Sequence, residues 1–197
     1  MSEKGITLVE ILVVIFIIAA LLTILVSDFP KIQRQFALSR ATYKFAQDLR
    51  KAQDMALSGE EIKKPDGTII SVKGYGIYID NRGNNGNNKE YKIYADLDDN
   101  ARYTSEAEDY TVNTIDLNKD APGVYIKDLY MIDNNYVSIN FNPPNPAISI
   151  SNLSAEADRA GIIFGLESDP ENSINTRTVY IWKSGLIEAR NNETFKF

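Results

Sequence analysis

Glu10 is the residue of this 197-residue chain whose surroundings are most unusual for its chemistry. It lies in an apolar run from Ile6 to Val26 in which the only other polar residues are Thr7 and Thr23. A carboxylate inside an apolar helix costs free energy, so it normally marks a specific partner. Glu10 is therefore a candidate for binding another polar or charged group.

A second set of carboxylates lies in the middle of the chain, where Asp96, Asp98 and Asn100 alternate. Alternating oxygen ligands suit a hard cation such as calcium. However, Ala101 and Ala107 stand where the EF-hand calcium pattern has its Gly and its last Glu. We therefore assign no metal from the sequence and keep two interpretations, a weak calcium site or an acidic, solvated turn.

The overall composition argues against an enzyme and against a nucleic-acid partner. The chain has no His, which is the commonest general base, and no Cys, so a disulfide cannot form. It holds 21 Lys+Arg and 27 Asp+Glu, a net charge of −6. Residues 1–59 carry seven positive and five negative side chains, which leaves 14 and 22, a net −8, for the rest. A net charge of −8 on residues 60–197 would repel the phosphate groups of a nucleic acid.

The apolar run predicts a membrane helix over residues 6–29. Its 21 residues from Ile6 to Val26 would span about 31 Å at ~1.5 Å per residue, enough to cross a bilayer. A secretory signal peptide fits badly, because the run is too long and no small-x-small cleavage site follows it. A plain signal anchor would explain the length but not Glu10.

The residues around Glu10 suggest a more specific interpretation. They form the stretch Lys4-Gly5-Ile6-Thr7-Leu8-Val9-Glu10. This stretch resembles the processing signal of type IV prepilins: a basic residue and Gly, then an apolar residue, with Glu at the fifth mature position. The resemblance implies a leader over 1–5, cleavage between Gly5 and Ile6 by a prepilin peptidase, N-methylation of Ile6, and a role for Glu10 in assembly.

Charge alone does not favour export of the head. Lys4 is offset by Glu3, whereas four basic residues follow the apolar run: Lys31, Arg34, Arg40 and Lys44. The resemblance nevertheless implies a single-pass protein of the bacterial inner (plasma) membrane with a cytoplasmic leader and an exported head. The subunit would later enter a cell-surface pilus or a periplasmic pseudopilus.

An amphipathic stem helix is expected over residues 30–59, after Pro30. The proline removes a backbone donor and predicts a kink or a break near its position. Four apolar residues of the stem share one helical face: Phe45, Leu49, Ala52 and Ala56. Gly59 is a suitable C-terminal stop. This stripe predicts a helix that packs on a sheet.

A β-rich head is expected over residues 60–197, so the fold class is α+β. Short runs rich in Ile, Val, Tyr and Phe are separated by turn residues. The predicted strands are 68–72, 75–80, 90–96, 111–117, 123–126, 136–141, 147–151, 161–166, 177–182 and 186–189. Ser184-Gly185 suggests a terminal hairpin. Together with the long helix packed on it, this antiparallel head matches the type IV pilin fold that the resemblance implies.

Three stretches narrow the resemblance: Tyr43–Gln53, Gly74–Asp80 and Thr178–Ile187. They are similar to the stem, first long strand and closing hairpin of GspH-class pseudopilins of type II secretion and FimT-like minor pilins. The implied function is that of a filament subunit without a cofactor. Its partners would be other pilins, the prepilin peptidase, the inner-membrane assembly platform and, before assembly, lipid. A major pilin and a DNA-binding competence minor pilin remain alternatives.

The leader generates a first prediction. Mass spectrometry of the mature protein should find Ile6 as the first residue, with a methylated amino group. Gly5→Leu should block processing and leave the chain in the membrane, because a side chain hinders the extended fit of the substrate in a tight cleft. Finding Met1 intact in assembled filaments would contradict the predicted cleavage.

Overall fold

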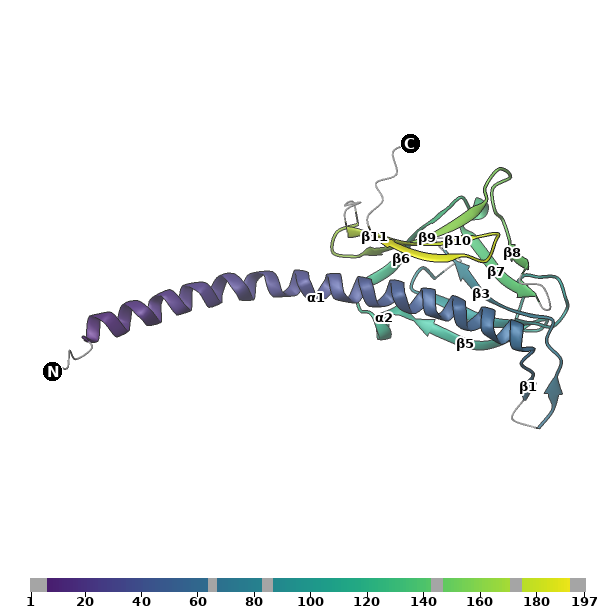
Figure 1. Cartoon of the computed structure of the whole chain (residues 1–197), viewed down its shortest axis with the longest axis horizontal. Coiled ribbons are helices and arrows are strands. Elements are labelled where there is room, and N and C mark those ends of the chain that lie inside the picture. Colours follow the sequence, from purple (N-terminus) through teal and green to yellow (C-terminus); the bar gives the residue numbers. More distant parts are fainter. Residues whose placement is uncertain (1–6, 64–66, 83–86, 143–146, 171–174, 192–197) are drawn as a thin grey trace. The chain divides into compact units, whose positions relative to one another are not determined.

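The computed structural model describes residues 7–63, 67–82, 87–142, 147–170 and 175–191, which form an α+β protein (Figure 1). The chain divides into an N-terminal unit, residues 1–36, and a head unit, residues 37–197. The long helix α1 (Leu8–Ser58) contributes to both units. Its first part makes up the described N-terminal unit, and residues 37–58 belong to the head unit.

α1 continues through Pro30 without interruption. The prediction of a break near Pro30 is therefore wrong, whereas a kink there stays a prediction. Proline deprives only the carbonyl of Val26 of its intrahelical donor. One missing bond does not end a helix when the segments on both sides form helix readily. Lys31 also contacts Asp28 one turn earlier, with 3.3 Å between Nζ and Oδ1.

The strands of the head unit form two main antiparallel sheets and one short pair (Figure 1). The five-stranded sheet has the order β5 (Tyr110–Asp116), β4 (Glu90–Asp96), β3 (Gly74–Asp80), β7 (Tyr136–Asn142), β8 (Ala147–Ile150). The four-stranded sheet has the order β11 (Ile187–Asn191), β10 (Arg177–Trp182), β9 (Arg159–Leu166), β6 (Val124–Tyr130). The short pair is β1 (Ile62–Lys63) with β2 (Ile69–Ile70), and two short helices are α2 (Leu117–Asp120) and η2 (Asp133–Asn135).

Runs rich in Ile, Val, Tyr and Phe between turn residues located most strands, and polar interruptions of these runs account for errors. β4 and β10 have the predicted bounds. β6 extends beyond the predicted end at Ile126, because its register with β9 shifts between Ile126 and Asp128. The predicted run ends there because Lys127 and Asp128 are polar, and the bulge lets the strand continue through them. The strand predicted over 68–72 is reduced to β2, and its partner β1 was not predicted.

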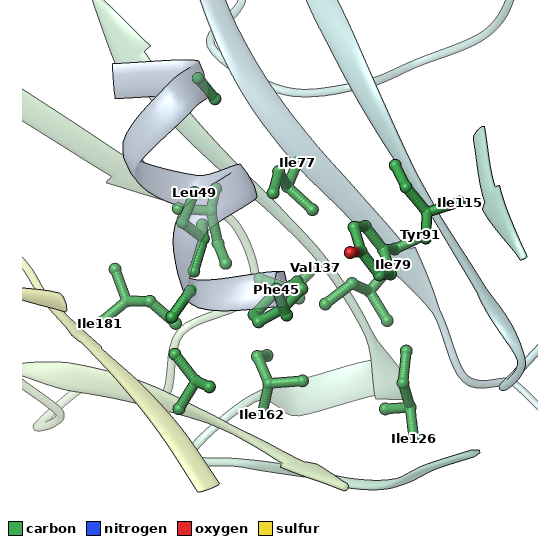
Figure 2. Packing of buried hydrophobic residues seen from close by; sticks show 14 of the residues in the cluster. Phe45, Leu49, Ile77, Ile79, Tyr91, Ile115, Ile126, Val137, Ile162 and Ile181 are labelled. Atoms are coloured by element: carbon green, nitrogen blue, oxygen red, sulfur yellow. The ribbon is translucent and has the colours of Figure 1, made fainter. Parts of the chain in front are cut away.

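The predicted stripe on α1 is buried and lies at the centre of the core. Phe45 contacts both sheets: its ring centroid lies 5.0 Å from that of Tyr91 in β4 and 5.4 Å from that of Phe164 in β9. Figure 2 shows Phe45 and Leu49 among branched aliphatic side chains of both sheets. The helix thus supplies the apolar surface that covers the inner faces of the two sheets.

Polar groups fix the position of the helix on this core. The Tyr91 hydroxyl group donates a 2.6 Å hydrogen bond to Asp48 Oδ2, and Lys44 Nζ lies 3.0 Å from the same oxygen. Burial raises the pKa of Tyr91, so its hydroxyl group stays a donor. Arg50 donates to the carbonyl oxygen of Ile187 at 3.3 Å. The helix is therefore bonded to both sheets.

The helix ends at the predicted place. Gly59 has φ +64°, its N–H group donates to Ala56 O at 3.2 Å, and the N–H group of Glu60 donates to Met55 O at 3.2 Å. These two bonds form a Schellman motif, which satisfies carbonyl groups that the helix end would otherwise leave unpaired.

The division into units predicts that the head unit folds alone. A fragment of residues 37–197 should be soluble and should unfold cooperatively with or without a reducing agent, since it keeps every buried residue of α1 and contains no Cys. A matched fragment of residues 50–197 lacks Phe45 and Leu49 and should be unfolded or aggregated. Circular dichroism with thermal melting distinguishes the two. Aggregation of both fragments would contradict an independent head unit.

Candidate functional site

The N-terminal part of α1 is the first region that could carry a function. Every side chain that the structure describes between residues 7 and 34 is exposed, although most are large and apolar. The mean hydropathy reaches 3.2 over an 18-residue window that is 0% buried. A helix that is apolar all round belongs in a core or a membrane. By length and composition, this segment could cross a membrane.

Glu10 lies in the first turn of this helix. The Oγ1 atom of Thr7 accepts a 3.2 Å hydrogen bond from the N–H group of Glu10, so Thr7 caps the helix. The spacing Thr7-x-x-Glu10 is that of a capping box, a signal that the sequence interpretation overlooked. The helix dipole also favours a carboxylate at this end. Gly5 and Ile6, the predicted processing residues, lie outside the described residues.

The surroundings of Glu10 on the helix are apolar. It borders a shallow surface hollow together with Ile11, Val14 and Ile15. Within the part of the chain that the structure describes, no Lys or Arg forms an ion pair with its carboxylate. The side chain is thus placed at one end of an exposed apolar surface, where a group from another molecule could reach it.

The second region is the outer face of the five-stranded sheet. Ser138 and Asn140 of β7 are buried, although they alternate with core residues and so point away from the core. Residues 97–109, which we call the acidic loop, cover them. The Tyr103 N–H group donates to Ser138 Oγ at 3.0 Å, and the Tyr103 ring lies 4.7 Å from Tyr78 and 5.4 Å from Tyr94 between centroids.

Two glycines of β3 make this covered surface possible. A Cβ atom on Gly76 would lie 2.7 Å from Cε1 of Tyr94 and 2.5 Å from the carbonyl oxygen of Ile139. A Cβ atom on Gly74 would lie 3.0 Å from Nδ2 of Asn140. Because residues opposite each other on paired strands share a face, the missing side chains leave the space that Tyr94 and Asn140 fill.

Three carboxylates meet beside Asn140. Asp96 at the end of β4, Asp98 in the acidic loop and Asp109 before β5 each place one carboxylate oxygen within 4.8 Å of the others. Asp96 and Asp109 are buried, whereas Asp98 is exposed. Asp96 Oδ2 accepts bonds from Asn140 Nδ2 at 3.0 Å and from the Ala101 N–H group at 2.8 Å. Asp96 and Asp98 are two residues apart in the sequence, and the fold of the acidic loop brings Asp109 to them.

Burial raises the pKa of Asp96 and also that of Asp109. Backbone N–H groups act in the opposite direction, those of Ala101 and Asp99 on Asp96 and those of Thr104 and Leu97 on Asp109. The charge of Asp109 raises the pKa of Asp96 and the charge of Asp98 raises the pKa of Asp109, because neighbouring negative charges repel each other. The cluster therefore concentrates negative charge where solvent screens it poorly.

The structure brings the predicted residues Asp96, Asp98 and Asn100 together. Asn100 lies beside the cluster and donates from Nδ2 to Asp98 Oδ2 at 2.6 Å. Ala101, which stands at the Gly position of the EF-hand pattern, has φ +58°, as that position requires. Sequence analysis missed Asp109, because it lies two residues beyond the last ligand position of that pattern.

Comparison with known proteins adds no relative to these observations: no family model matches the chain, and no curated protein or solved structure is significantly similar to it.

The covered face yields a prediction about Gly76. Gly76→Ala should lower the free energy of unfolding by about 1–3 kcal/mol, because the added methyl group would displace Tyr94 or the β7 backbone. Gly123→Ala is the control: no atom lies within 4 Å of its added Cβ, so only the strain of φ +80° applies, about 1 kcal/mol. Urea unfolding of the full chain in detergent measures both. A smaller loss for Gly76→Ala than for the control would contradict the close packing of Tyr94.

Proposed function

We propose that this chain is a structural subunit of a type IV pilus or a type II secretion pseudopilus, of the minor GspH- or FimT-like kind and with the type IV pilin fold. The observation that carries the proposal is the first part of α1, an exposed helix that is apolar all round and has one carboxylate at its start. Such a helix can lie in lipid first and then among copies of itself in a filament.

The physics of the two environments gives Glu10 its role. Lipid tails are as apolar as the helix, so moving from bilayer to filament core gains little from the hydrophobic effect. Packing of apolar helices alone also distinguishes poorly between neighbouring axial positions. A polar group near the helix start can make that distinction, because a wrong stagger leaves it without a partner.

The proposed partner of Glu10 is the amino group of a neighbouring subunit. Cleavage after Gly5 would create a positive amine on Ile6, four residues before Glu10. In a staggered array the amine of one subunit can reach Glu10 of the next. Pairing recovers part of the desolvation cost of both groups, whereas leaving one partner alone costs about 3–5 kcal/mol. The pair would thus set the register of assembly more than the overall stability.

The head supports the narrower assignment through the location of the three family-like stretches. They contain Phe45, Leu49 and Ala52 of the buried stripe, the whole of β3, and most of β10 with the turn into β11, in which Gly185 has φ +92°. Proposed partners are other pilins, the prepilin peptidase, the inner-membrane assembly platform and lipid, and no cofactor is needed. The acidic head, with its net charge of −8 beyond residue 59, disfavours a DNA-binding role.

The proposal predicts the behaviour of Glu10→Val. The variant should insert and be cleaved like the wild-type chain, since the apolar run only lengthens. Its incorporation into filaments beside wild-type subunits should fall at least about tenfold, because a mismatch of ~1.4 kcal/mol already changes an equilibrium by that factor. Quantitative mass spectrometry of sheared filaments or cross-linked pseudopili measures the ratio.

Two variants separate pairing from helix capping. Thr7→Val removes the side-chain cap of the same turn but keeps the carboxylate, so it should assemble almost normally. Asp28→Val removes a carboxylate elsewhere on α1 and should also assemble. Normal incorporation of Glu10→Val would refute the register role, and failure of Thr7→Val to the same extent would assign the effect to the helix end.

A further inference from the structure

Asp109 is buried without full satisfaction of its hydrogen-bonding groups. Its side chain is only 3% exposed, and Oδ2 accepts a 2.7 Å bond from the Thr104 N–H group. Oδ1 accepts no hydrogen bond of normal geometry within the described residues, although the Leu97 N–H group is near enough to lower the pKa of Asp109. A buried carboxylate oxygen without a donor is costly, and an unsatisfied group of this kind calls for a ligand or another explanation.

Asn140, which donates to Asp96, gives a second observation. It is wholly buried, and its Nδ2 atom donates to Asp96 Oδ2 at 3.0 Å and to Asn142 Oδ1 at 2.6 Å. The Oδ1 atom of the same amide has no partner in the described part of the chain. An oxygen of the cluster itself and an oxygen of the amide that donates to Asp96 are thus both buried and both lack a donor within the described residues.

We propose that Asp96, Asp98 and Asp109 bind one hard divalent cation of the calcium class on the outer face of the five-stranded sheet. This inference concerns the head alone and does not depend on assembly into a filament.

The spacing of the carboxylates suits such an ion. Calcium binds oxygen ligands at about 2.3–2.6 Å, so two ligands of one ion lie at most about 5 Å apart. The oxygens of Asp96, Asp98 and Asp109 all lie within 4.8 Å of one another. Small side-chain rotations therefore suffice to bring all three onto one centre.

The charge and the ligand types select the class of ion. No Lys or Arg in the described ranges forms an ion pair with the three carboxylates, and nearby Lys92 instead pairs with Glu106 at 3.0 Å. The chain offers no His and no Cys, the ligands that zinc and copper prefer. An irregular loop with carboxylate and amide oxygens suits calcium better than magnesium, which demands near-ideal octahedral geometry.

The cation would hold the acidic loop in place. It would join the end of β4 at Asp96 to the two ends of the acidic loop, at Asp98 and at Asp109 just before β5. Binding only the folded arrangement, it would stabilise the head unit and keep Tyr103 over Ser138. The site would thus have a structural role, as no group in it requires the cation for a reaction.

The test uses the full chain in a non-ionic detergent after treatment with a chelator. Isothermal titration with CaCl2 should show saturable binding at a stoichiometry of one. The melting temperature of the head should rise by roughly 5–10 °C at a hundredfold excess over Kd. KCl at equal ionic strength should not reproduce this rise. Terbium should give luminescence sensitised by Tyr94 and Tyr103, and calcium should displace it.

Variants locate the site. Asp109→Asn and Asp98→Asn should each weaken calcium binding at least about tenfold, which corresponds to the loss of one charged ligand. Without calcium, Asp109→Asn should melt at the same temperature as the wild-type chain or higher, because it removes a repelling buried charge. Asp99→Asn is the matched control in the same loop, and its affinity should be unchanged.

Three results would overturn the proposal. They are the absence of both heat and a melting shift at millimolar calcium, an equal loss of affinity in Asp99→Asn, and a calcium response that survives in Asp98→Asn and Asp109→Asn alike. The last two would assign the effect to diffuse acidic charge on the loop.

Discussion

The ring of Phe45 contacts Tyr91 of one sheet and Phe164 of the other, and the architecture of the head depends on this side chain. Each sheet has an apolar inner face that neither could bury by itself. The stripe on residues 37–58 covers both faces at once, and Phe45 lies among side chains of both sheets (Figure 2). Truncating a buried Phe typically costs about 3–5 kcal/mol. No disulfide supplements this core, since the chain has no Cys.

The same helix meets two physical requirements in succession. Over residues 37–58 one face is buried and the other is polar, so the helix is part of a soluble fold. Before residue 36 apolar side chains are exposed on every side, so that segment needs an environment that the chain itself does not supply. Lipid and a bundle of like helices both meet this need. The proposed role as a filament subunit follows from the difference between these two halves.

Local patterns predicted the features that local physics determines. The stripe of Phe45 and Leu49 has the helical period, and β4 and β10 are short runs with Ile, Val and Tyr bounded by turn residues, so the local sequence located all three. Local patterns did not predict contacts between segments that are far apart in the sequence. Asp109 joins Asp96 only because the acidic loop folds over β7, and Gly76 matters only because Tyr94 lies across it. α1 continues through Pro30, so the loss of one backbone hydrogen bond destabilises the helix less than the turns on both sides stabilise it.

The way in which α1 is held has a mechanical consequence. Its buried side chains run from Leu38 to Ala56 along the helix, and Asp48 and Arg50 bond it to the two sheets. A tensile load applied along the helix axis would therefore act in shear on all of these contacts together, because none can slide without the others. A load applied across the axis would instead peel the helix away one turn at a time. The head should therefore resist a force along the axis of α1 more strongly than a force across that axis.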